Sequence, residues 1–353
     1  EKVGSNYITD IVDYTAKFEN GENSEVRWIQ FKIPLEEFER SVGSIQDFKS
    51  IRFMRMFLHG AEKDVFLRFA TLDLVRSEWR KYNLPLYETI EQVTGNAEEG
   101  GLDISAVNIE ENANKKPVNY VLPPGFDREI DPSNPQIRQL NEQSMVMKVT
   151  NLEDGDARAA YKNTNLDMRQ YKKLKMEIHC EELIDDQTLN NGELTVFIRL
   201  GSDYVNNFYE YEVPLKLTPH GKYNNSNDDD RFVVWPEENR IDIDLSLFTD
   251  AKLARNDERR RAGSNVSFNT VYEYFDDEKR VVVRGNPNLS NVRTIMIGVR
   301  NPKRSNYLNP DNDGYPKSGE IWVNELRLTD FKDKSGWAAN ARVKANLADF
   351  GSV

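Results

Sequence analysis

Two aspartates two positions apart are the strongest candidate for a metal site in this chain. Asp311 and Asp313 lie in the segment Asn-Pro-Asp-Asn-Asp-Gly at 309–314, and carboxylates at this spacing before a glycine are typical of calcium-binding loops. The distal glutamate of a full calcium loop is missing. An Asn/Asp/Gly turn explains the same residues, as it does the acidic run at 228–230, so a structural Ca²⁺ and a plain turn both stay open.

The histidines offer little chemistry. His59, His179 and His220 have no metal-ligand neighbour at helical or hairpin spacing. His179 precedes Cys180, but adjacent residues on a strand point to opposite faces and cannot act together as base and nucleophile. We therefore expect structural roles for both residues.

Carboxylates are abundant, and their spacing favours a strand surface over a catalytic pair. Asp242 and Asp244 alternate with apolar residues, which predicts the solvent face of a strand. A glycoside hydrolase needs two carboxyl groups about 5 to 9 Å apart in a cleft, and residue counts leave that alternative open. We interpret the chain as a protein that is not an enzyme.

A cluster of aromatic residues suggests an alternative function. Sugar-binding sandwich modules stack their ligands on such rings, so a pair of carbohydrate-binding modules on a cell-surface glycan-binding protein is the alternative. Packing within a core explains the same rings. The residues concerned are Tyr204, Phe208, Tyr209 and Tyr211.

Composition narrows the classes of partner. The 353 residues are 38% apolar and 30% charged, with a net charge of −12. A nucleic-acid partner is not expected, because phosphate binding needs clustered Lys and Arg. The single cysteine rules out an internal disulfide framework. No apolar run reaches the roughly 18 residues of a transmembrane helix. The abrupt start at Glu1 suggests a fragment of a longer chain.

Most of the chain reads as short strands separated by polar turns. One short helix is predicted at 35–42, between Pro34 and Gly43. The pattern predicts an all-β fold of antiparallel sandwiches, with surface loops at 224–230 and 255–261. Arg52, Arg55, Arg293 and Arg300 are predicted on strands, covering a sheet face or pairing with acids. The predicted strands span 26–33, 50–58, 64–74, 145–150, 174–179, 194–200, 209–213, 232–235, 281–284, 293–299 and 320–328.

An internal similarity suggests two copies of one unit. Segments within 28–74 and 240–328 share an apolar strand, an arginine-bearing strand and a closing strand. Their order resembles the second half of a galactose-binding-like jelly roll, so we expect tandem jelly-roll sandwiches, the first truncated. The predicted domains are 1–88 (first jelly roll), 89–143 (ordered Pro/Gly/Glu-rich linker, with one strand at 104–109), 144–332 (second jelly roll) and 333–353 (start of a barrel strand).

The last seventeen residues alternate as a membrane-barrel strand does. Trp337, Ala339, Ala341, Val343 and the odd positions to 347 are apolar, whereas most even positions between them are polar. About a dozen residues with one apolar face suffice for a tilted strand to cross the hydrocarbon core.

Several segments resemble one known family. They are GEIWVNELRLTDF at 319–331, the segment at 336–350, WIQFKIPL at 28–35, IRFMRMF at 51–57, VNIEEN at 107–112 and PVNYVLPPG at 117–125. In this order they resemble the SprA/Sov family, the outer-membrane translocon of the type IX secretion system of Bacteroidetes, which also serves gliding motility.

The resemblance implies a very large single-chain barrel through which folded cargo leaves the cell. This chain would be a non-catalytic soluble region that shapes or gates the pore exit at the outer membrane or cell surface. The extracellular side is favoured because barrels place their long loops outside, and the periplasmic side is the alternative. The implied partners are the rest of the barrel chain, accessory outer-membrane secretion proteins and secreted cargo.

Overall fold

The structure is a computed structural model of the chain. It divides into two units, residues 1–74 and 75–353. The structure describes residues 5–17, 21–35, 40, 42, 54–60, 64–72, 79–82, 86, 101–128, 130, 139–184, 188–276, 279–303, 313–332, 346–347 and 351–352.

The first unit contains a two-stranded antiparallel ribbon. β1 (Ile8–Lys17) pairs with β2 (Asn23–Phe31), and Val12 lies opposite Trp28 on the same side of the ribbon as Tyr14. These side chains remain 38% to 60% exposed. Apolar residues at every second position thus give the ribbon one apolar face, and β2 confirms the strand predicted at 26–33.

The strands predicted at 50–58 and 64–74 are wrong over the residues that the structure describes. Residues 54–60 and 64–72 lie outside helices and strands, and Phe57 and Phe66 are 77% and 93% exposed. Strand propensity is decided by packing against neighbouring strands, which an apolar run by itself does not provide. The helix predicted at 35–42 falls mainly on residues outside the described ones.

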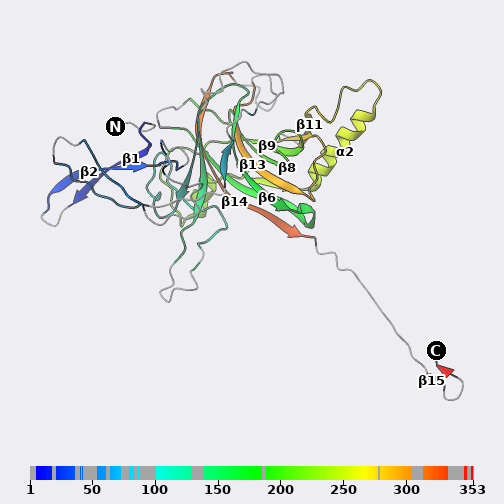
Figure 1. Cartoon of the computed structure of the whole chain (residues 1–353), viewed down its shortest axis with the longest axis horizontal. Coiled ribbons are helices and arrows are strands. Elements are labelled where there is room, and N and C mark those ends of the chain that lie inside the picture. The colour runs from blue at the N-terminus through cyan, green and yellow to red at the C-terminus, as the bar shows by residue number, and fades with distance from the viewer. Residues whose placement is uncertain are drawn as a thin grey trace. The chain divides into compact units, whose positions relative to one another are not determined.

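The two large sheets of the second unit are both antiparallel (Figure 1). The smaller sheet has the strand order β10-β7-β14-β5-β4, and β14 is its longest and central strand. Its strands are β4 (Gly101–Asn108), β5 (Gln143–Leu152), β7 (Tyr171–Glu181), β10 (Ile241–Asp244) and β14 (Lys317–Phe331).

The larger sheet has the order β11-β12-β9-β8-β13-β6-β3. The sequence predicted its central strands but missed β3, β6 and β11, which contain many polar residues. Its strands are β3 (Arg80–Tyr82), β6 (Ala157–Leu166), β8 (Thr195–Gly201), β9 (Phe208–Pro214), β11 (Tyr272–Asp276), β12 (Lys279–Arg284) and β13 (Val292–Arg300).

The main core lies between the two sheets. Alternate residues of β7, including Met176, Ile178 and Cys180, pack with alternate residues of β13, including Ile295 and Ile297. Nearly all of these side chains are inaccessible to solvent, and each such burial stabilises the fold by about 1.5–3 kcal/mol. The two sheets therefore form a sandwich.

The outer face of the five-stranded sheet carries a second core. Tyr120, Trp235 and Trp322 pack together there with centroid separations of 5.6 to 6.2 Å. The Trp235 indole donates a hydrogen bond to the Val121 carbonyl at 2.9 Å. Residues 117–122, within the predicted linker, thus lie against the sheet.

Two α-helices correct the sequence interpretation. α1 (Asp228–Val234) begins after Asn227, whose side chain accepts a hydrogen bond from the Asp229 amide, so most of the strand predicted at 232–235 is helical. α2 (Ser246–Arg260) contains most of the charged run predicted as a loop at 255–261 and contacts β11 and β12 (Figure 1). The local helix propensity of this charged run did not indicate a helix. Helix α2 is stabilised by the packing of its one buried face. Short 3₁₀ turns span Met168–Gln170 and Glu237–Asn239.

The structure confirms an all-β fold with antiparallel sheets. In the last segment it describes only 346–347 and 351–352, where β15 (Asn346–Leu347) pairs with β16 (Gly351–Ser352). The rest of the predicted barrel strand lies outside the described residues. Among the described helices, none combines the length and apolar character needed to span a membrane.

Candidate functional site

A ladder of arginine and glutamate crosses the outer face of the seven-stranded sheet. Arg199 on β8 lies opposite Glu210 on β9, and Arg280 on β12 lies opposite Glu212 on β9. Arg300 at the end of β13 completes the set. Because Tyr209, Tyr211 and Val213 point into the core, the alternation of β9 turns both glutamates outward. All five charged residues are at most 7% exposed.

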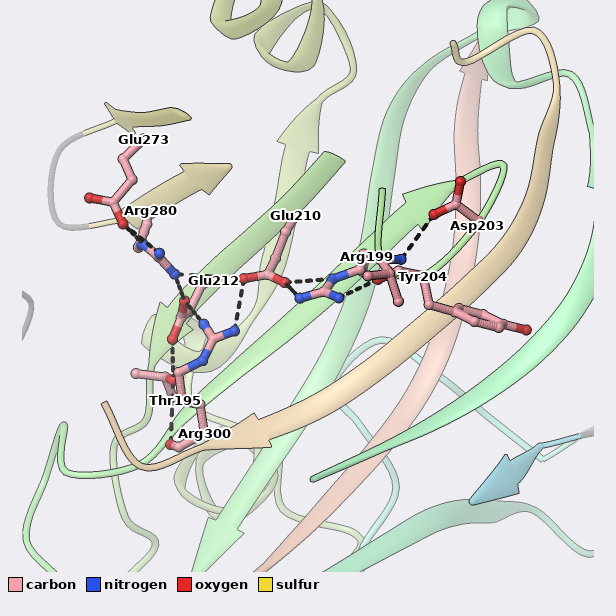
Figure 2. A network of polar contacts seen from close by, with 10 residues as sticks. Thr195, Arg199, Asp203, Tyr204, Glu210, Glu212, Glu273, Arg280 and Arg300 are labelled. Carbon is pink, nitrogen blue, oxygen red and sulfur yellow. Dashed lines mark hydrogen bonds and ion pairs between the residues drawn. The ribbon is translucent and has the colours of Figure 1, made fainter. Parts of the chain in front are cut away.

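The ladder is continuous (Figure 2). Arg199 donates to Glu210 at 2.6 and 2.8 Å, and Arg300 donates to the other oxygen of Glu210 at 3.0 Å. Glu212 accepts from Arg280 at 2.8 Å and also from Arg300. At the ends, Thr195 donates to Glu212, and Arg280 reaches Glu273 of β11.

Among the described residues, the three arginines meet three carboxylates, those of Glu210, Glu212 and Glu273. Burial raises the pKa of Glu210, but Arg199, Arg300 and Arg280 outweigh burial and hold the pKa below its ordinary value. Burial lowers the pKa of Arg199, opposed by Glu210. Opposite charges in contact favour the charged forms of both groups. The glutamates and arginines of the ladder are therefore ionised.

This arrangement suits structure better than chemistry. Each glutamate in the ladder is already bonded to guanidinium groups, and arginine does not release its proton in proteins. The guanidiniums of Arg199 and Arg300 also lie 3.9 Å from the Phe208 ring centroid and 4.6 Å from that of Phe197. The ladder therefore links four strands, β8, β9, β12 and β13, through buried ion pairs.

A second buried polar cluster lies on the outer face of the other sheet. Lys115 contacts Glu181 at 2.5 Å and Glu320 at 3.0 Å, and it lies over the Trp322 ring. His179 stacks on Trp322 with a centroid separation of 3.8 Å. Burial raises the pKa of Glu181, but His179 and Lys115 outweigh it and lower the pKa overall. This cluster ties residues near 115 to the sheet.

The predicted calcium aspartates are only partly described. Asp311 lies outside the described residues. The Asp313 carboxylate accepts hydrogen bonds from the Tyr315 amide and the Lys317 ammonium, both at 2.9 Å, and these bonds lower its pKa. The part of the chain that the structure describes contains no group of three metal-ligating side chains. A calcium site at Asp311 and Asp313 stays a prediction.

The predicted sugar-stacking rings are mostly enclosed. Phe208, Tyr209 and Tyr211 are 3% exposed or less. Tyr204 packs against Tyr161, with centroids 4.9 Å apart, and donates to the Asn163 side chain. The predicted cluster therefore provides no exposed aromatic platform.

The His179 and Cys180 side chains point to opposite faces of β7, as predicted. Cys180 belongs to the core between the sheets, whereas His179 packs outside it, and both are inaccessible to solvent. Burial raises the pKa of the Cys180 thiol, which disfavours the reactive thiolate.

The positions of the other charged residues that were predicted on strands follow from the strands on which they lie. Asp242 and Asp244 lie on the exposed side of β10, and Asp242 pairs with Lys173 and Lys175. Arg300 pairs with acids, as predicted. Arg293 is exposed on β13.

The exposed Arg55 lies outside any strand, and Arg52 lies outside the described residues. Sequence reasoning missed Arg199, Arg280 and their glutamates. Their signal was the alternation of Glu210 and Glu212 with apolar residues on β9, and a single arginine within the otherwise uncharged strand β8.

One shallow cavity of about 380 Å³ lies beside the second core. Its lining includes Asn119, Tyr223 and Asn225, but their polar atoms already serve the fold. Asn119 exchanges hydrogen bonds with the Tyr223 backbone, and Asn225 accepts from the Leu122 amide. The cavity therefore offers a ligand few free polar groups.

Together these features define an all-β sandwich protein in which the buried polar clusters support the fold. The family model SprA_N, described as motility related/secretion protein, matches residues 1–353. The chain therefore belongs to this family, which confirms the resemblance noted from its sequence. No curated protein matches the chain. A family related to secretion and motility points to the cell envelope.

Proposed function

We propose that this chain is a non-catalytic soluble region of a giant outer-membrane barrel, the translocon of the type IX secretion system. In this role it shapes or gates the exit of the pore. The observation that carries the proposal is the family match over residues 1–353, which describes a motility and secretion protein. The buried clusters support a mechanical role, because their ionic groups are committed to one another.

Within this proposal the sandwich is a galactose-binding-like jelly roll. The chain passes repeatedly between the two sheets, with β5, β7, β10 and β14 in one and β6, β8 and β13 in the other. Such crossing between sheets is typical of double-sheet jelly rolls. A rigid sandwich of this kind can stand in or over a pore without changing shape as cargo passes.

The proposal places the next segment in the membrane. β14 ends at Phe331, and the alternating pattern starts at Trp337. An apolar side facing lipid and a polar side facing the lumen require this period of two. The soluble region would lie outside the cell by the loop-length argument, with the barrel chain, accessory outer-membrane proteins and cargo as partners.

Single-cysteine scanning across 338–347 of the full-length protein in outer membranes tests the barrel strand. Other cysteines, including the buried Cys180, are first replaced. A water-soluble maleimide should label Cys at the even positions strongly and at the odd positions weakly. Uniform labelling would overturn the barrel strand.

The same approach tests the side of the membrane. Tyr315 is 69% exposed, so Tyr315→Cys should react with an impermeant maleimide. Labelling of intact cells is expected for the extracellular side. Labelling that appears only after the outer membrane is permeabilised would assign the region to the periplasm.

A further inference from the structure

One end of the sandwich combines exposed aromatic and cationic groups. β14 ends where β7 begins, and Phe331 lies opposite Tyr171 in the strand register. The Lys332 amide donates to the Gln170 carbonyl at 2.7 Å, which holds the chain at this end. We name Tyr171, Lys172, Phe331 and Lys332 the exit surface, because β14 ends there.

Of the two rings of the exit surface, Tyr171 is partly buried against the main core, and Phe331 is open to solvent. Phe331 is 57% exposed even though its ring meets Tyr171 edge-on at 5.6 Å. β5 pairs with β14 only as far as Val323, whereas β7 pairs with it to Phe331. The last residues of β14 thus extend past one partner strand and present an aromatic ring at their tip.

The charged part of the exit surface contains two exposed lysines. Lys172 and Lys332 are exposed, and neither forms an ion pair with any residue that the structure describes. The nearby cations Arg169 and Lys173 are paired with Asp167 and Asp242.

Two carboxylates lie close to these lysines. Asp330 is exposed beside them, and Asp244 accepts a hydrogen bond from the Ser246 amide. Lys332 also helps to lower the pKa of Asp244, after the hydrogen bonds from Ser246. The two lysines are therefore exposed cations outside any ion pair among the described residues, with two carboxylates nearby.

We propose that the exit surface lies at the headgroup level of the outer membrane, with the Phe331 and Tyr171 rings in the interface and Lys172 and Lys332 against lipid phosphates. This inference rests on the proposed function, in which the residues after β14 enter the barrel. Aromatic residues form girdles where barrel strands meet the membrane interface. Lysines near such positions extend their ammonium groups to the headgroups.

A lipid occupant fits this surface better than a protein. The rings stand at the end of a strand, next to exposed lysines that form no ion pair among the described residues, and do not form a broad apolar patch. Protein interfaces have depleted charge at their centre, with lysine under-represented. A membrane interface is apolar on its hydrocarbon side and charged at the headgroups. An aromatic ring beside a lysine fits this change of polarity.

Spin labels on the full-length protein, reconstituted in vesicles of phosphatidylethanolamine and phosphatidylglycerol, test the inference. The labels are attached at Phe331→Cys, Tyr315→Cys and Val343→Cys, each in a background without other cysteines. Tyr315 is the matched control, because it is also an exposed aromatic. It lies two residues before the start of β14, whose fifteen residues span about 50 Å.

A spin label that collides often with oxygen lies in lipid. A spin label that collides often with a water-soluble nickel chelate is exposed to water. The oxygen-to-nickel collision ratio should be several-fold higher at 331 than at 315, and highest at 343. A label at 331 that meets mainly nickel, or neither reagent as in a protein contact, overturns the exit surface as a membrane site. If 343 still reports lipid in that case, the barrel proposal stands; if 343 reports water, the barrel proposal fails as well.

Discussion

At the residue scale, Glu212 shows how this protein holds buried charge. It accepts hydrogen bonds from Thr195, Arg280 and Arg300 and has no exposure to solvent. Removing ions from water costs several kcal/mol each, and only well-formed pairs offset that cost. The fold therefore depends on the ladder being complete more than on any one pair.

Replacing Glu212 by Gln should destabilise the sandwich strongly. The amide cannot balance Arg280 and Arg300, and an uncompensated buried charge costs about 3–5 kcal/mol. The free energy of unfolding in urea measures the loss. The control is Glu238→Gln, whose partner Lys216 is exposed, and it should change the value by less than about 1 kcal/mol. Equal effects of the two variants would contradict a structural ladder.

The ladder also predicts a pH dependence. The pKa of Glu210 is lower in the folded protein than its ordinary value of 4.5. The stability it contributes is therefore fully present above pH 4.5 and is lost as the pH falls through the folded pKa. Urea unfolding at pH 7, 5, 4 and 3 should show a falling midpoint below pH 5. The slope should flatten in Glu210→Gln, and an unchanged slope would argue against ionised Glu210.

At the scale of elements, one glycine sets how closely two strands and their side chains pack. Gly298 on β13 lies opposite Phe197 on β8, and a Cβ at 298 would come within 2.1 Å of the Phe197 ring. That ring in turn lies beneath the Arg300 guanidinium. The absence of a side chain at 298 therefore allows the ring to lie flat below the ladder.

Gly298→Ala should shift the Phe197 ring and disturb the ladder above it. Overpacking of this kind costs about 1–3 kcal/mol, which thermal unfolding would detect as a lower Tm. Gly221→Ala is the matched control, because the nearest atom to its Cβ is the Tyr223 ring at an ordinary 3.5 Å. The steric account fails if both variants have the Tm of the parent protein.

At the scale of the whole molecule, the two units differ in how they are built. The described clusters of buried side chains contain residues from Tyr82 onward, drawn from both sheets and from α1 and α2. In the first unit, Ile8 is the only large apolar side chain found buried among the described residues. The sandwich therefore contains its own core.

A fragment of residues 75–332 should fold without the first unit. Its core already lies between its own two sheets, and domains with a complete core generally fold alone. A single cooperative urea transition, with near-ultraviolet circular dichroism typical of packed aromatic rings, is the expected result. A fragment that binds hydrophobic dyes and lacks a cooperative transition would show that residues 1–74 are required.

The sequence by itself determined the all-β class, the central strands and the family. Segments such as 194–200 and 293–299 were predicted as strands from their short apolar runs and alternating residues. This pattern can be recognised from neighbouring residues alone. The same logic placed Asp242 and Asp244 on an exposed face and separated His179 from Cys180. It failed at 64–72, where apolar residues found no paired strand, and at 232–235, where a helix cap decided the conformation.

Only the tertiary structure decided which distant residues meet. Arg199, Arg280 and Arg300 are separated by up to a hundred positions, and strand order alone brings them to two glutamates on β9. Likewise, residues near 120 join the outer face of a sheet through contacts with Trp235 and Trp322. The order in which strands pair depends on the whole chain, because the free energy of burial depends on all strands together. The alternation of apolar and polar residues, in contrast, is a property of each strand's own sequence.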